Sequence, residues 1–74
     1  MDNYHITKGV IEWEFKKEKS TEVILSNSKK DDLISAVSAY MQDKTGSVKI
    51  HKEDGTIQEE RTYPRSADPS KTKG

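Results

Sequence analysis

The sequence predicts a small α+β domain in which a five-stranded, mainly antiparallel sheet carries one helix on one face. Three observations point to this class. Apolar and charged residues alternate strictly from residue 11 to residue 16, a stretch with helical periodicity covers residues 33–41, and Asp54-Gly55 is a strong hairpin signal. Weaker strand-like segments complete the predicted order of strand, strand, strand, helix, strand, strand (βββαββ).

The second strand is the clearest element. Ile11, Trp13 and Phe15 alternate with three charged residues, which is the pattern of a strand with one buried face and one solvated face. Trp13 and Phe15 hold most of the aromatic bulk of the chain, so we expect them to anchor the core.

Two further strands flank this segment. Tyr4 and Ile6 alternate with polar residues and predict a short first strand, which ends at the turn signal Lys8-Gly9. Residues 21–25 are rich in β-forming side chains and predict a third strand. Its run Val23-Ile24-Leu25 breaks the alternation, so one of these residues should face outward or lie at a bulge.

An amphipathic helix of about four turns is predicted after the third strand. Ser28 is the expected N-cap, and Asp31 and Asp32 suit the positive end of the helix dipole. Gly46 follows the last turn as a stop signal. The stripe expected to face the sheet consists of Leu33, Ile34, Val37, Tyr40 and Met41.

Residues 47–63 predict a hairpin that turns at Asp54-Gly55. Alternation places Val48, Ile50 and Ile57 on the core face in both registers considered. The same alternation places Glu59 and Arg61 on the helix side, either beyond the helix end or as a pair at the rim of the domain. The opposite face then carries Lys49, His51, Gln58 and Glu60.

The chain is expected to form one domain over residues 1–63, followed by a disordered polar tail over residues 64–74. There is no cysteine, so neither a disulfide nor a thiolate metal site is available. No apolar run approaches the roughly 18–20 residues of a membrane-spanning helix, and the start does not resemble a signal peptide. We therefore expect a soluble, cytoplasmic protein without a membrane partner.

Charge and motifs narrow the function. Residues 1–63 hold ten basic and twelve acidic side chains, so the basic excess typical of a nucleic-acid binder is missing. The chain has no nucleophile motif, phosphate-binding glycine loop or catalytic carboxylate pair. His5 and His51 fall on polar strand faces without a third ligand at a fixed spacing. We predict no catalytic residues, no metal site, no cofactor and no enzymatic activity.

The uncovered face of the sheet is the predicted interaction surface, and its expected partner is another protein. The chain itself is expected to be a monomer or a weak homodimer. One alternative is a nucleic-acid-binding protein that uses Lys49, Lys52 and Arg61 together with the basic tail, and another is a small enzyme or metal protein built on the two histidines. The candidate partner-binding residues are Glu12, Glu14, Lys16, Lys49, His51, Gln58, Glu60 and Arg61.

Segments along most of the chain carry a resemblance to a known family. They are Tyr4-His5-Ile6, residues 13–18, the helix opening at residues 28–31 and, most specifically, residues 46–63. Over residues 4–63 the chain resembles the small bacterial and phage proteins grouped as domain of unknown function 2188. It departs from them at Ile11-Glu12-Trp13, where the family has a Gly-Trp entry, and in a helix that is less rich in alanine.

The resemblance implies the fold and a bacterial or phage setting. The family has no assigned activity, so the resemblance implies no mechanism. The functional expectation that follows from setting and size is a small non-enzymatic protein-binding module, specifically a phage-encoded modulator or inhibitor of a host protein.

Overall fold

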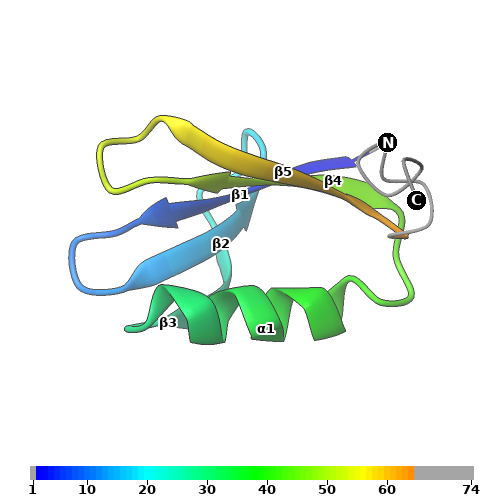
Figure 1. Ribbon diagram of the computed structural model, residues 1–74, viewed down its shortest axis with the longest axis horizontal. Coiled ribbons are helices and arrows are strands. Elements are labelled where there is room, and N and C mark those ends of the chain that lie inside the picture. Colours follow the sequence, from blue (N-terminus) through cyan, green and yellow to red (C-terminus); the bar gives the residue numbers. More distant parts are fainter. Residues whose placement is uncertain (1, 65–74) are drawn as a thin grey trace.

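A computed structural model describes residues 2–64 and contains the six predicted elements in the predicted order (Figure 1). All five strands belong to one sheet with the order β3-β2-β1-β4-β5. The α+β class and the βββαββ order are therefore confirmed. Of the tail predicted over residues 64–74, residues 65–74 lie outside the described residues. The elements are β1 (Asp2–Lys8), β2 (Trp13–Lys17), β3 (Val23–Asn27), α1 (Lys30–Tyr40), β4 (Gly46–His51) and β5 (Ile57–Tyr63).

The middle of the sheet is a parallel pair, β1 with β4, and the other neighbouring strands are antiparallel. From β3 the chain passes through α1 and returns beside β1, a crossover long enough to permit parallel pairing. Asp2 lies opposite Gly46, and Gly46 lies opposite Tyr63. Because β1 and β4 run the same way, the β1–β2 turn and the β4–β5 loop lie at one end of the molecule (Figure 1).

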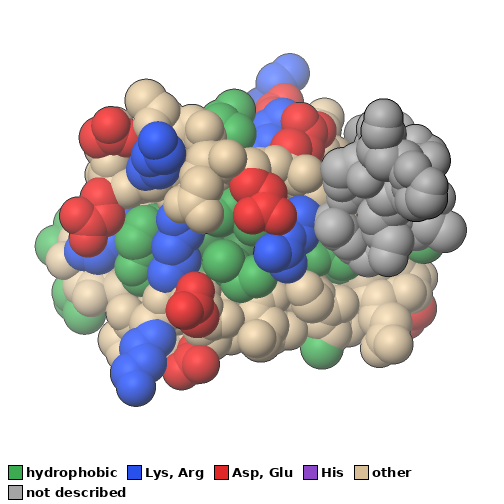
Figure 2. Space-filling model, in the orientation of Figure 1, with side chains coloured by type: hydrophobic (Ala, Val, Ile, Leu, Met, Phe, Trp, Pro, Cys, Tyr) green, Lys and Arg blue, Asp and Glu red, His purple; other side chains and the backbone are tan. Residues whose placement is uncertain are grey.

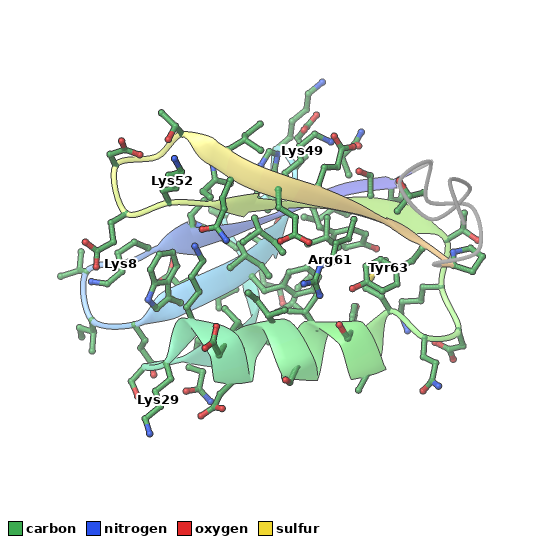
Figure 3. The ribbon with its side chains drawn as sticks, viewed as in Figure 1. Lys8, Lys29, Lys49, Lys52, Arg61 and Tyr63 are labelled. Carbon is green, nitrogen blue, oxygen red and sulfur yellow. The ribbon has the colours of Figure 1, made fainter. Side chains whose placement is uncertain are left out.

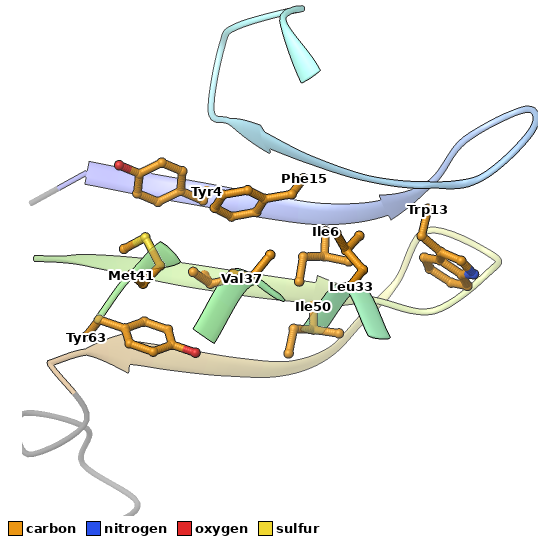
Figure 4. Close-up of a cluster of buried hydrophobic side chains, with 10 residues drawn as sticks. Tyr4, Ile6, Trp13, Phe15, Leu33, Val37, Met41, Ile50 and Tyr63 are labelled. Atoms are coloured by element: carbon orange, nitrogen blue, oxygen red, sulfur yellow. The ribbon is translucent and has the colours of Figure 1, made fainter. Parts of the chain in front are cut away.

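The core lies between the sheet and α1. Phe15 is fully buried and stacks on Tyr4 with ring centroids 5.2 Å apart, while Tyr40 meets it edge-on at 5.6 Å. Trp13 lies at one end of the cluster and Tyr63 at the other (Figure 4). Of the residues expected to face the core, the following are buried: Trp13, Phe15, Leu33, Val37, Met41, Val48 and Ile50.

The start of α1 differs from the prediction. Lys29 occupies the N-cap position without a side-chain cap, and its amide donates to Asn27 Oδ1 at 2.9 Å. Asn27 ends β3 and reaches two residues ahead, as asparagine does in turns, so Ser28 is not the cap. The helix has 11 residues, about three turns, because the chain already turns away after Tyr40.

The helix packs against β2 and β3, which form one side of the sheet. Between α1 and β5, apolar side chains reach the surface and are surrounded by charges of both signs (Figure 2). Lys30, in the first turn of α1, contacts side chains of both β2 and β5. Its ammonium lies 4.7 Å from the centre of the Trp13 ring and donates to Gln58 Oε1 at 2.7 Å. In residues 2–64 no helix is long and apolar enough to cross a membrane.

A bulge corrects the predicted faces of the hairpin. The register shifts between Ile50 and His51, so that His51 pairs with Ile57 while Ile50 pairs with Glu59. The extra residue on β5 reverses the alternation. Ile57 therefore shares the face of His51 and is 54% exposed instead of joining the core, and the Gln58 side chain reaches α1.

The second strand is shorter than predicted, and the third is irregular as predicted. β2 begins at Trp13, so Ile11 lies in the β1–β2 turn, 86% exposed, beside the fully exposed Val10. A register shift opposite Phe15 and Lys16 leaves Val23 paired with Lys16 and 41% exposed. This is the outward-facing residue that the broken alternation of residues 23–25 indicates.

Trp13→Ala should lower the free energy of unfolding by about 3–5 kcal/mol, because it empties a buried aromatic site that Lys30 also covers. A loss of that size is comparable to the whole stability of so small a domain. Urea denaturation followed by circular dichroism measures it. Val10→Ala is the control, and it should change the stability by no more than about 0.5 kcal/mol. Equal effects of the two substitutions would contradict the assigned burial.

Candidate functional site

The face of the sheet opposite α1 carries a row of polar side chains, which we call the open face. The register of the strands shows which residues share this face. Thr7 lies opposite Glu14, and His5 lies between Lys16 and Lys49 on its two neighbouring strands. Core residues alternate with these positions along each strand. The open face consists of His5, Thr7, Glu14, Lys16, Glu18, Ser26, Ser47, Lys49, His51 and Glu60, with Glu12 hydrogen-bonded at its margin to Ser26 at 2.9 Å.

Six of the eight predicted binding residues therefore lie together, and two do not. Gln58 and Arg61 lie on the helix side of β5. Arg61 and Tyr63 both point from β5 toward α1 (Figure 3). Arg61 Nε donates to Glu59 Oε2 at 2.7 Å, and this carboxylate raises the pKa of Arg61, with a further hydrogen bond to Tyr63. The two alternatives left open for Glu59 and Arg61 resolve as a pair at the domain rim.

A chain of hydrogen bonds through both histidines occupies the centre of the open face. Glu18 Oε1 lies 2.9 Å from His5 Nε2, and His5 Nδ1 lies 2.8 Å from His51 Nε2. His51 Nδ1 lies 2.8 Å from the carbonyl oxygen of Gly55. The chain thus joins the β2–β3 turn, β1, β4 and the β4–β5 loop. Sequence patterning placed both histidines on polar faces but contained no signal that β1 and β4 are neighbours.

Charges on the open face are compensated locally. Lys49 Nζ donates to Asn3 Oδ1 at 3.0 Å and lies 3.5 Å from Glu60 Oε2, which also accepts from the Ser47 hydroxyl. The hydrogen bond from His5 lowers the pKa of Glu18, and the positive charges of Lys49 and Lys19 contribute. The surface is therefore polar and internally bonded, without a field of one sign.

Depressions on the described surface lie both on the open face and on the helix side. A shallow one of about 260 Å³ lies on the open face beside the histidines and is lined in part by Lys16, Lys19 and Ser20. A larger one of about 480 Å³ lies between the end of α1 and the end of β5, at Ser38, Gln42 and Tyr63. Tyr63 and Ser38 are hydrogen-bonded there at 3.1 Å. Within residues 2–64 no three His, Asp or Glu side chains are grouped so that they could hold a metal ion.

A comparison with protein families identifies the chain. The model of a family described as uncharacterized protein conserved in bacteria (DUF2188) matches residues 4–63. The chain belongs to this family. A comparison with curated proteins and with solved structures found no match. Membership confirms the resemblance carried by residues 46–63, and the family description names no activity or ligand.

Replacing His5 should raise the pKa of Glu18. That pKa lies below its ordinary 4.5 chiefly because His5 hydrogen-bonds the carboxylate, so the contribution of Glu18 to stability is present above the ordinary value and is lost as pH falls through the lowered one. In His5→Leu the carboxyl carbon resonance of Glu18 should titrate closer to 4.5. Lys17→Gln, which removes a neighbouring cation but leaves the hydrogen bond, is the matched control. A Glu18 titration that is the same in His5→Leu as in the parent would contradict the assigned contact.

Proposed function

We propose that the protein is a small non-enzymatic module that binds another protein through its open face. The observation that carries this proposal is that α1 covers one face of the sheet, whereas no described element covers the other. Half-buried polar groups on the open face already have partners within the domain, so they are held in place before a partner arrives. Ordered side chains lose less conformational freedom on binding than mobile ones.

Exposed apolar side chains at the margins of the open face support a docking role. Ile57 on β5 and Val23 on β3 flank it on the two edge strands. Val10 and Ile11 project from the β1–β2 turn, at the end where the β4–β5 loop also lies (Figure 1). These exposed apolar side chains give a partner apolar surface to desolvate.

The size of the face indicates how a partner would use it. Five strands about 4.8 Å apart and about six residues long cover on the order of 500 Å². One partner contributes roughly 800 Å² to a standard protein–protein interface. The open face supplies somewhat more than half of that area, so the proposed complex also takes in the turns at its ends, among them Val10-Ile11.

The setting of the proposal follows from the family. The family is conserved in bacteria, and we place the activity in the cytoplasm of a bacterium or a phage-infected host. A phage-encoded modulator or inhibitor of a host protein is the specific form of the module that we propose. Small size and a pre-ordered docking face suit a protein that acts by occupying a surface of its target.

Nucleic-acid binding is the second candidate, and the open face argues against it. Of the cations named for that function, Lys49 is bonded to Asn3 and Glu60, and Arg61 to Glu59. Figure 2 shows charges of both signs interspersed on the visible side of the molecule. Phosphate recognition needs cations that are free to replace counterions, and the basic tail named for it lies outside the described residues.

The double substitution Glu14→Lys with Glu60→Lys tests the proposal. It adds four units of positive charge to the open face, two at each site, and it removes the partners of Lys16 and Lys49. Capture of a specific protein from bacterial lysate, measured by pull-down and mass spectrometry, should fall at least about tenfold, a loss of about 1.4 kcal/mol. A nucleic-acid binder would instead gain affinity and show a steeper salt dependence.

A matched variant separates the effect of the open face from the effect of net charge. Asp32→Lys with Asp43→Lys adds the same four charges at the helix side of the domain, where both residues are exposed. This variant should retain the complex, and both proteins should keep a cooperative thermal transition. If both variants lose the complex equally, net charge and not the open face determines binding.

A further inference from the structure

The hydrogen-bonded chain through His5 and His51 determines which of its ring nitrogens carry hydrogen. Three contacts link four groups: the Glu18 carboxylate, the two imidazoles and the Gly55 carbonyl. Each contact needs one hydrogen. A carbonyl oxygen has none to give, and the pKa of Glu18 is lowered, so the carboxylate is an acceptor as well. Both outer nitrogens, His51 Nδ1 and His5 Nε2, must therefore carry hydrogen.

The contact between the two rings then sets the protonation state. Two neutral imidazoles have one hydrogen each, and the outer contacts use both. The inner nitrogens, His5 Nδ1 and His51 Nε2, would face each other at 2.8 Å as two bare lone pairs. Two added protons would place two N–H groups against each other. One added proton is the state in which all three contacts are hydrogen bonds.

We propose that His5, His51 and Glu18 form a proton-binding site that holds one additional proton between the two imidazole rings and thereby completes a continuous hydrogen-bonded link between two turns across the open face. Glu18 belongs to the β2–β3 turn and Gly55 to the β4–β5 loop. The ring pair carries one positive charge and Glu18 one negative charge, so the site is neutral in this state. The proposal concerns the free domain and does not depend on the docking function.

The ring geometry favours a shared proton over a metal ion. The ring centroids are 5.0 Å apart, and the inner nitrogens are 2.8 Å apart. The difference is about the diameter of one imidazole ring, so both nitrogens lie close to the line that joins the ring centres. Their lone pairs therefore point at each other, as in an N–H···N bond, instead of converging on a common ligand position.

The surrounding charges define the pH range over which the ring pair holds one added proton. Glu18 favours the first proton, whereas Lys16 and Lys17 on β2, Lys19 in the next turn and Lys49 on β4 disfavour a second. Glu60 on β5 offsets Lys49, and Lys52 and Asp54 in the β4–β5 loop are of opposite sign. Each step away from one proton breaks the contact between the rings, so the continuous link between the two turns should be lost at both acidic and basic pH, while the contacts of Glu18 and Gly55 with their own rings remain.

Nuclear magnetic resonance of the ring nitrogens tests the proposal. With nitrogen-15 histidine, the two rings should titrate together in two steps, as for a coupled pair. Between the steps, His51 should carry its hydrogen on Nδ1 and His5 on Nε2. The Gly55 amide resonance should shift with both steps. One independent step per ring, or a hydrogen on His51 Nε2 with a bare Nδ1, overturns the proposal.

Three variants complete the test. In His51→Leu the His5 ring should titrate in one step, and an unchanged His5 curve contradicts the coupling. Glu18→Gln should move uptake of the first proton to lower pH, because it removes the carboxylate that favours the positively charged ring pair. The matched control Glu22→Gln, on an exposed residue of the same chain segment, should leave it in place. If the His51→Leu substitution disrupts folding, the parent tautomers and the comparison of Glu18→Gln with Glu22→Gln still decide the question.

Discussion

The parallel pairing of β1 with β4 is the constraint on which the rest of the structure depends. It joins the β1–β2–β3 unit, which α1 covers, to the β4–β5 hairpin, which α1 touches less. Gly46 makes the close approach possible at the start of this pair, because a Cβ there would lie 2.9 Å from both the Asp2 carbonyl oxygen and the Tyr4 ring. Without this pair the hairpin would have neither a sheet nor a core, and isolated hairpins are marginal in water.

The elements that local patterning could predict are those with one buried and one solvated face. Trp13 and Phe15 alternate with charges, and the helix stripe around Leu33 and Val37 has the right period, so the core follows from their sequence. The bulge in β5 does not follow, because its one extra residue leaves no compositional mark, whereas the irregularity of β3 is visible as broken alternation in residues 23–25. Ile57 and Gln58 are therefore placed on the wrong faces by alternation alone.

The candidate site was likewise predictable only in those parts that follow from local alternation. Polar positions of the open face were predictable from period two, since Glu14, Lys16 and Lys49 each alternate with a core residue. Contact between His5 and His51 was not, because it needs a register between strands 46 residues apart in the chain. Arg61 was included by charge, although its guanidinium is held by Glu59 on the other side of β5. Long-range register, which no local pattern encodes, decides which polar residues act together.

The alignment of Asp2, Gly46 and Tyr63 across three adjacent strands bears on how the chain could be re-routed. β1 starts and β5 ends at the same end of the sheet, separated by β4 alone, which corresponds to about 10 Å. A linker of roughly four residues spans that gap, and a new start could be opened in the exposed β1–β2 turn. Such a circular permutant would keep every strand pairing while changing the order in which the strands are made. The order of the strands in the sheet would stay the same, while their order along the chain would differ.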